Sequence, residues 1–162
     1  MPTTLKNEAA IAGIGQTEFS KNSGRSELQL ACEAVSAALD DCGLDPGEVD
    51  GLTTFTMDTT DEVELAQNVG LGDLTFFSRI PYGGGAAIGV MQQAAMAVAT
   101  GVANYVVVYR AFNERSGHRY SAGVGEGIVT ADLVHWGWYM SVGLLTPASW
   151  VAMFTQRYMH EY

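Results

Sequence analysis

Apolar and polar residues follow two different spacings along the first 113 positions of this 162-residue chain. Short apolar runs, bounded by glycine, proline or acidic residues, predict strands at residues 8–15, 49–56, 74–80 and 104–109. Apolar residues that repeat every three or four positions predict helices at residues 28–42, 60–69 and 85–100. Strands and helices therefore alternate, which indicates a layered α/β fold built on a mainly parallel sheet.

Residues that begin and end helices support these boundaries. Ser26 precedes the first helix and is a favoured N-cap, and Gly43 follows it at a position that commonly takes a left-handed conformation. Pro81 ends the third strand, and Gly101 closes the third helix. That third helix carries apolar residues around nearly its whole circumference, so we expect it to be buried on all sides.

The character of the sequence changes after residue 113. Residues 116–143 are rich in glycine and aromatic residues and follow no strong periodicity, which indicates an excursion from the sheet. Thr146 then predicts the start of a last helix at residues 147–161, with proline at its first position. We therefore divide the chain into an α/β region, residues 1–113, and a loop region, residues 114–162.

Composition narrows the possible partners. The chain has 8 basic and 18 acidic residues and a net charge of −10, so it lacks the clustered Lys and Arg that bind nucleic acid or anionic lipid. The apolar run at residues 86–99 contains two glutamines and is too short to span a bilayer. No signal peptide and no disulfide framework are recognisable, so we expect a cytoplasmic protein.

Several residues with candidate chemistry have simpler explanations. Cys32 and Cys42 lie on the apolar stripe of the first helix, which predicts core residues rather than nucleophiles. Gly13 and Gly15 begin a dinucleotide-binding fingerprint, but Glu18 occupies the third glycine position. The isolated histidines are predicted to be structural or solvent-facing, and we expect no metal site: they are His118, His135 and His160. Three aromatic residues either line an apolar ligand channel or belong to a core or interface: they are Trp136, Trp138 and Tyr139.

A glycine loop, formed by Tyr82, Gly83, Gly84 and Gly85, joins the third strand to the third helix. One explanation is a flexible turn. The other is a substrate-binding loop, where glycine lets a ligand approach the backbone at the positive end of a helix. A buried helix behind the loop favours the second explanation. We take these four residues as the candidate substrate-binding site.

A resemblance to thiolases is carried by residues 82–113, YGGGAAIGVMQQAAMAVATGVANYVVVYRAFN, which are similar to the thiolase active-site loop, buried helix and following strand. Two further segments resemble the sterol carrier protein x branch of the thiolases. They are the opening, AIAGIGQTEFSKNSGRSELQLACEAVSAALDDCGL, and the end, LLTPASWVAMFTQRYMHEY. The resemblance covers essentially the whole chain. It implies the βαβαβαβ half of a thiolase-like fold with an inserted loop region.

Thiolases place their nucleophilic cysteine where this sequence has Gly84, and glycine cannot form an acyl-enzyme. The triple glycine, AVATG and YRAFNERSG resemble the actinobacterial lipid-transfer-protein aldolases instead. That resemblance implies a carbon–carbon lyase of steroid side-chain degradation, which cleaves a β-hydroxyacyl-CoA by a retro-aldol reaction into propionyl-CoA and a steroid ketone. It also implies that the catalytic acid and base lie in a C-terminal half absent from this chain, so the 162 residues alone are expected to be inactive.

The same resemblance implies partners. CoA enters as part of the substrate, and no separate cofactor is expected. A homodimer is expected, with strand 74–80 at its interface. Phe76 and Phe77 point to opposite faces of that strand, so at least one of them should be buried in the sheet layer. An OB-fold protein carrying a zinc ribbon is the expected partner. A non-catalytic acyl-CoA-binding or scaffolding subunit, or a lyase for a non-steroid substrate, remains an alternative on the sequence alone.

Overall fold

A parallel sheet forms the centre of the computed structural model, which describes residues 5–55, 58–80, 85–116 and 137–162. In the described residues its strands are β1 (Gly51–Phe55), β2 (Phe76–Ile80) and β3 (Val106–Val108). Their order is β2-β1-β3, with both pairings parallel. The central strand pairs Gly51 with Phe76 on one side and with Val106 on the other.

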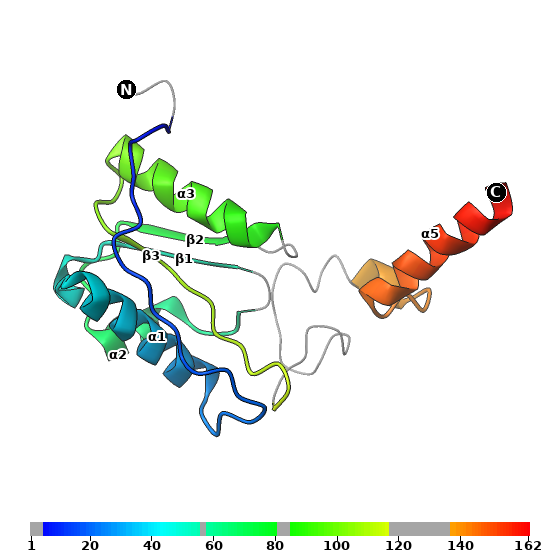
Figure 1. Ribbon diagram of the computed structural model, residues 1–162, viewed down its shortest axis with the longest axis horizontal. Helices are drawn as coiled ribbons and strands as arrows, with labels where there is room; N and C mark the ends of the chain where they lie inside the picture. The colour runs from blue at the N-terminus through cyan, green and yellow to red at the C-terminus, as the bar shows by residue number, and fades with distance from the viewer. Residues whose placement is uncertain (1–4, 56–57, 81–84, 117–136) are drawn as a thin grey trace.

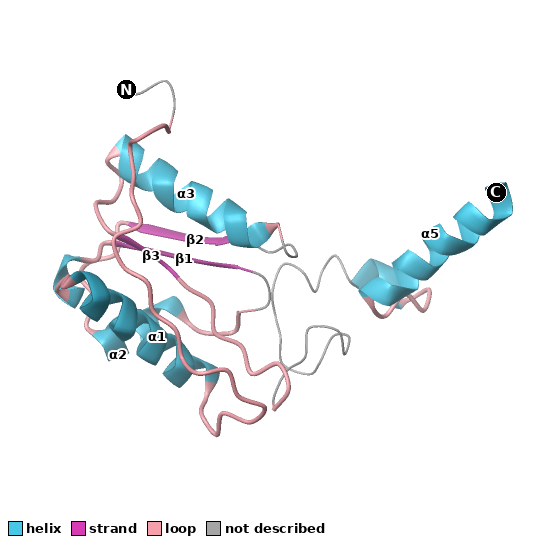
Figure 2. Cartoon of the chain, viewed as in Figure 1, coloured by secondary structure: helices cyan, strands magenta, loops and turns pink. Residues whose placement is uncertain are grey.

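Helices cover the sheet on both faces. One face carries α1 (Glu27–Cys42) and α2 (Glu62–Val69), while α3 (Ala86–Thr100) lies on the other (Figures 1 and 2). A short 3-10 turn, η1 (Pro46–Glu48), leads into β1, and α5 (Pro147–Glu161) extends apart from the sheet. This layered arrangement confirms the predicted α/β class. Among the described residues, no helix has the length and apolar character needed to cross a bilayer.

The predicted helix ends are confirmed in detail. The Ser26 side chain accepts a hydrogen bond from the Gln29 N–H at 3.1 Å, which satisfies one of the unpaired donors of the first turn of α1. Gly43 and Gly101 have φ angles of 65° and 72°, a left-handed conformation that favours glycine. Asp61 caps α2 by accepting from the Val63 and Glu64 N–H groups, so this helix begins slightly later than predicted.

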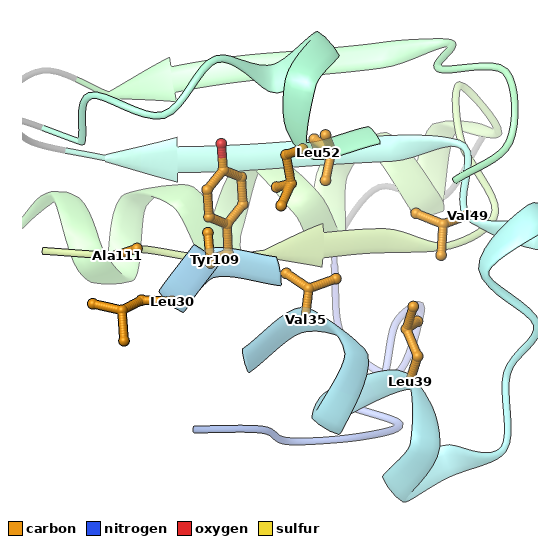
Figure 3. Close-up of a cluster of buried hydrophobic side chains, with 9 residues drawn as sticks. Leu30, Val35, Leu39, Val49, Leu52, Tyr109 and Ala111 are labelled. Atoms are coloured by element: carbon orange, nitrogen blue, oxygen red, sulfur yellow. The ribbon is translucent and has the colours of Figure 1, made fainter. Parts of the chain in front are cut away.

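The main core lies between the sheet and α1 with α2. Leu52 of β1 and Leu65 of α2 are fully buried, and Val35 of α1 is nearly so. Figure 3 shows the side chains of α1 gathered beneath β1 and the Tyr109 ring. The complete buried cluster is Leu30, Ala31, Val35, Leu39, Val49, Leu52, Leu65, Tyr109 and Ala111.

The predicted first strand, residues 8–15, is wrong: this segment is extended but pairs with no described strand. It lies against α1 instead. A Cβ on Gly13 or Gly15 would come within 2.2 Å of an α1 backbone oxygen, that of Ala38 or Ala34. The Ile14 N–H donates to the Asp41 carboxylate at 3.0 Å. Close packing against the helix therefore explains this glycine pair.

The predicted full burial of the third helix is also wrong. An inner stripe of α3 faces the sheet and is buried, formed by Ala86, Val90, Ala94 and Ala97. The opposite side is exposed, with Ile88 at 70% and Met96 at 48%. The physical reason is that α3 lies on one face of a single sheet, and no described element of this chain covers its outer side.

The structure confirms some of the remaining expectations and contradicts others. Phe76 and Phe77 are not buried, because β2 is an outer strand of the sheet. Cys32 packs against the core as predicted, but Cys42, the last residue of α1, is exposed. Residues 147–161 form the predicted helix, although none of its residues is buried. The division at residue 113 stays a prediction.

Candidate functional site

The candidate glycine loop joins the carboxyl end of β2 to the start of α3. Tyr82, Gly83 and Gly84 lie outside the described residues. Gly85 is the N-cap of α3 and makes no side-chain capping bond, and a Cβ added there would meet nothing within 4 Å. The first backbone N–H groups of a helix lack intrahelical acceptors and carry partial positive charge. The start of α3 can therefore stabilise an anionic group beside Gly85.

Two contacts hold α3 on β2 behind this loop. The Ser78 hydroxyl donates to the Gln93 side-chain oxygen, which joins the middle of the strand to the helix. A Cβ on Gly89 would lie 3.0 Å from the Ile80 Cδ1 atom, so glycine permits the helix to approach the strand closely at this point. The end of β2 and the start of α3 are thereby fixed relative to each other.

A buried polar network joins the carboxyl ends of the strands on the opposite face of the sheet. Asp58 follows β1 and is fully buried. One of its carboxylate oxygens accepts hydrogen bonds from the Thr60 N–H, at 2.8 Å, and from the Thr60 hydroxyl. The other accepts from the Ala111 N–H at 3.0 Å. Asp58 therefore ties the loop after β1 to the segment after β3.

Arg79 of β2 joins the same network. Its guanidinium donates to the backbone oxygen of Asp58 and, at 2.9 Å, to that of Thr60. Arg79 lies in the strand that leads into the glycine loop, so the loop after β1 and the end of β2 are held together. This arrangement positions backbone and closes the sheet end, and it leaves Asp58 and Arg79 engaged with protein groups.

Tyr109 completes the network. Its hydroxyl lies 2.9 Å from the Thr60 hydroxyl, and because Thr60 donates to Asp58, Tyr109 donates to Thr60. Burial, reinforced by the nearby Asp58 carboxylate, raises the pKa of Tyr109 to about 12. The phenol is therefore neutral at physiological pH and acts as a hydrogen-bond donor within the core (Figure 3).

This network was missed from the sequence. The available signal was an aspartate directly after a buried strand, where the carboxyl ends of parallel strands meet and where sites of α/β proteins are found. Nothing in the spacing of Asp58, Arg79 and Tyr109 reveals that they converge, because each follows or lies in a different strand. Only the sheet order brings them to one place.

The remaining candidate residues that the structure describes lie in α5 or just before it. Tyr139 packs edge-to-face on Trp150 of α5 at 4.9 Å, while Trp138 is 79% exposed. His160 is exposed on α5. Trp136, His118 and His135 lie outside the described residues. Within the described ranges, no three side chains of metal-binding type come together.

Comparison with known proteins relates the chain to thiolase-like aldolases. It is 63% identical, over 99% of its length, to a steroid side-chain-cleaving aldolase of Thermomonospora curvata. It is 60% identical, over 96% of its length, to a 17-hydroxy-3-oxo-4-pregnene-20-carboxyl-CoA lyase of Mycobacterium tuberculosis. The chain spans 41% of the length of each of these relatives. No family model matches the sequence.

Solved structures show the same relationship. A structure described as an Ltp2-ChsH2(DUF35) aldolase superposes with a TM-score of 0.74 and 64% identity over 94% of this chain, and the match covers 38% of that structure. A monomeric SCP2-thiolase-like protein of Mycobacterium smegmatis superposes with a TM-score of 0.50 and 26% identity over 60% of this chain and 22% of its own. The fold is therefore thiolase-like α/β, and the similarity in sequence is to steroid side-chain-cleaving aldolases.

Proposed function

We propose that these residues form the N-terminal part of a thiolase-like aldolase that cleaves a steroid β-hydroxyacyl-CoA. The observation that carries the proposal is the 63% identity, across 99% of the chain, to a steroid side-chain-cleaving aldolase. The named substrate of the second relative, a 17-hydroxy steroid carrying a carboxyl-CoA group, has the functional groups that a retro-aldol reaction needs. Both relatives extend well beyond the matched region, so the activity belongs to a longer polypeptide.

The proposed reaction breaks the bond between the hydroxyl-bearing carbon and the α-carbon of the thioester. A base removes the hydroxyl proton, a ketone forms, and the bonding electron pair passes to the α-carbon as an enolate. Protonation of that enolate releases propionyl-CoA beside the steroid ketone. The N–H groups at the start of α3, which lack intrahelical acceptors, are suited to stabilising negative charge on the thioester oxygen.

Gly84 gives this proposal its chemical distinction from a thiolase. The position has no side chain, so the substrate is never held as a covalent acyl group there. Tyr82, Gly83, Gly84 and Gly85 are proposed as backbone contacts of the substrate. The catalytic acid and base are proposed to lie outside the present 162 residues. CoA is part of the substrate, and we propose no further cofactor.

The proposed assembly follows the structural relative, an Ltp2-ChsH2(DUF35) aldolase, whose name joins an Ltp2 chain to a DUF35 partner. We propose a comparable partner for this protein, an OB-fold protein with a zinc ribbon, and a homodimer in the cytoplasm. The outer position of β2 in the sheet leaves this strand available for a dimer contact. The similar protein of Mycobacterium smegmatis is described as monomeric, so sedimentation of the longer protein is the direct test of the dimer.

The activity is tested with a hybrid polypeptide, in which residues 1–162 replace the matching region of the Thermomonospora curvata aldolase. The hybrid is purified with a DUF35 partner and given 17-hydroxy-3-oxo-4-pregnene-20-carboxyl-CoA. Propionyl-CoA and a steroid ketone should form in equal amounts, and the intact mass of the hybrid should show no acyl adduct. Binding of the thioester without cleavage would favour the alternative, a non-catalytic acyl-CoA-binding or scaffolding subunit.

A variant pair tests the glycine loop. Gly84→Val places bulk where the thioester is proposed to approach and should lower the rate by about 100-fold or more. Gly137→Val is the matched control, since a Cβ there would meet nothing within 4 Å and the residue lies outside the loop. Equal rates for the two variants would remove the loop from the proposed site.

A further inference from the structure

A row of polar side chains crosses the sheet at the carboxyl ends of its strands. Thr54 of β1 is aligned with Arg79 of β2. Thr53 is aligned with Val108, so the next position, Tyr109, continues the row on the β3 side. Aligned residues of neighbouring parallel strands direct their side chains to the same face. The row therefore places a guanidinium, a hydroxyl and a phenol side by side, on the face that α1 and α2 cover.

This row is more polar than packing requires. The Thr54 hydroxyl is fully buried and has no hydrogen-bond partner among the described residues. Arg79 lies half-buried beside it. Buried polar groups without partners lower stability, and apolar side chains of similar size fill a core at least as well. A polar row that lowers stability at the carboxyl ends of parallel strands is the pattern expected beside a functional site.

Arg79 supplies a second attachment for an outer strand. In the described sheet β2 pairs only with β1, so its carboxyl end has a neighbouring strand on one side alone. The Arg79 guanidinium donates to the backbone oxygens of Asp58 and Thr60. The Asp58 carboxylate accepts in turn from the Ala111 N–H, beyond β3. The end of β2 is thereby joined, across β1, to the segment that follows β3.

The end of β2 determines in turn where α3 begins. Ile80 is the last residue of the strand, and a Cβ on Gly89 would lie 3.0 Å from its Cδ1 atom. The Gly89 N–H donates to the oxygen of Gly85, the N-cap residue of α3, at 3.2 Å. A displacement of Ile80 therefore reaches the first turn of α3 through a single contact. It would also displace the N–H groups there that lack intrahelical acceptors.

We propose that Arg79 is a positioning residue for the lyase reaction, which holds the end of β2 so that the start of α3 is correctly placed against the thioester oxygen. Its guanidinium is engaged with two backbone oxygens, so it acts through the backbone and not by touching the substrate. This proposal rests on the proposed function, in which the start of α3 stabilises the enolate. A misplacement of such donors by about 1 Å can lower a rate by about 100-fold.

The opposite end of the same sheet carries a matched control. Asp50 directly precedes β1, and its carboxylate accepts from the N–H groups of Asn104 and Tyr105, each at 2.9 Å. Asp50 is half-buried, as Arg79 is, and it also joins segments of two strands. Substitutions at the two positions should therefore destabilise the fold comparably. Because Asp50 lies at the amino ends of the strands, only Arg79 should influence the reaction.

The two positions are compared in the hybrid polypeptide with its DUF35 partner, at a temperature where both variants are folded. Arg79→Met keeps the apolar stem and removes the donors. It should lower kcat by about tenfold or more and change KM by less than about threefold, since the placed donors act on charge that develops in the transition state. Asp50→Asn should leave both constants within about twofold of wild type.

Two kinetic results would overturn the proposal. One is a kcat for Arg79→Met that is no lower than the kcat for Asp50→Asn, which would make Arg79 a structural residue only. The other is a loss of kcat/KM that lies entirely in KM, which would make Arg79 a substrate-binding residue. If Arg79→Met does not fold, Arg79→Lys carries the same comparison. It keeps the charge but replaces the planar fork by a single ammonium, and its kcat should be lower by about threefold or more.

Hydrogen exchange in the same hybrid, without substrate, separates this proposal from the lyase function. The Gly89 amide should exchange about tenfold faster in Arg79→Met than in wild type, because the first turn of α3 loses its support. Asp50→Asn should not accelerate it. If the wild-type hybrid fails to cleave the thioester, the proposed function fails, and exchange at Gly89 still decides whether Arg79 holds α3 in place. Unchanged exchange at Gly89 in Arg79→Met would overturn the positioning role.

Discussion

The two faces of the sheet differ in how completely this chain covers them. Toward α1 and α2, large apolar side chains such as Leu52 and Leu65 are fully buried, and the polar groups of Asp58 are paired. Toward α3, the buried stripe is mostly alanine, and the outer side of the helix exposes Ile88 and Met96. The face toward α1 and α2 is therefore a fully covered core. The other is a packing layer whose outer surface retains apolar residues without a cover among the described residues.

This difference between the two faces indicates which face stabilises the fold and which is available for contacts with other polypeptide. Burial of large side chains supplies most of the free energy of folding, so the α1 and α2 face should account for the stability of the short chain. Small residues on α3 bring this helix close to the sheet and contribute less by burial. Its exposed apolar side is suited to later burial in a larger assembly. The following changes test this contrast, from the largest expected effect to the smallest.

Leu52→Ala should have the largest effect. Leu52 is fully buried between the sheet and α1, and its truncation removes apolar burial and leaves a cavity, at a cost of about 2–5 kcal/mol in the free energy of unfolding. Urea denaturation of the wild-type chain and of the Leu52→Ala variant measures this difference. A loss no larger than that of an exposed α3 residue would break the contrast between the two faces.

Asp58→Asn should cost about 1–3 kcal/mol. The amide keeps the shape of the side chain but replaces one acceptor oxygen by a donor, which leaves a buried N–H of Thr60 or Ala111 without a partner. Glu64→Gln, on the exposed side of α2, is the matched control and should change the unfolding free energy by less than about 0.5 kcal/mol. Equal changes in unfolding free energy for the two variants would mean that water replaces the hydrogen bonds of Asp58.

Tyr109→Phe should cost about 1 kcal/mol through loss of the hydrogen bond to Thr60. The free energy of unfolding of the wild-type chain should also depend on pH, because the folded state holds the Tyr109 phenol proton more tightly than the unfolded chain does. This contribution is complete below about pH 10 and is lost as the pH rises toward about 12. Unfolding curves of wild type and variant across that interval should converge, and parallel curves would contradict the assignment.

Ile88→Ser should have the smallest effect, within about 0.5 kcal/mol, since this side chain is 70% exposed on the outer side of α3. The same substitution in the hybrid polypeptide sharpens the contrast. If the outer side of α3 is covered there, the cost should rise to more than about 1 kcal/mol. An identical small effect in both proteins would show that this side remains in water.

Local signals predicted the elements well because they act within a few residues. Ser26 and Gly43 set the ends of α1 through hydrogen bonding and backbone conformation, and both are found in their predicted roles. The apolar run around Val107 correctly predicted a strand. The segment at residues 8–15 was predicted wrongly from similar local evidence, because its glycines serve close packing against α1, a contact that short-range spacing does not reveal.

The substrate-binding role of the glycine loop stays a prediction, although the position of its last residue is found in the structure. Gly85 was recognised at the start of a helix behind a strand, and it does form the uncapped N-terminus of α3. The network around Asp58 was not predicted, because its members are separated by up to 53 positions and have no shared motif. The exposed side of α3 was also missed, since an apolar circumference indicates that burial is favourable and not which molecule provides it.

The sequence by itself determined the alternation of strands and helices, their caps, the glycine at the thiolase nucleophile position and the likeness to thiolase-like aldolases. These properties depend on residue identity and short-range spacing. The tertiary structure alone decided the order β2-β1-β3, the convergence of Asp58, Arg79 and Tyr109, and the packing of residues 8–15 against α1. Such features depend on which distant segments become neighbours, and that choice is made by the packing of the whole chain.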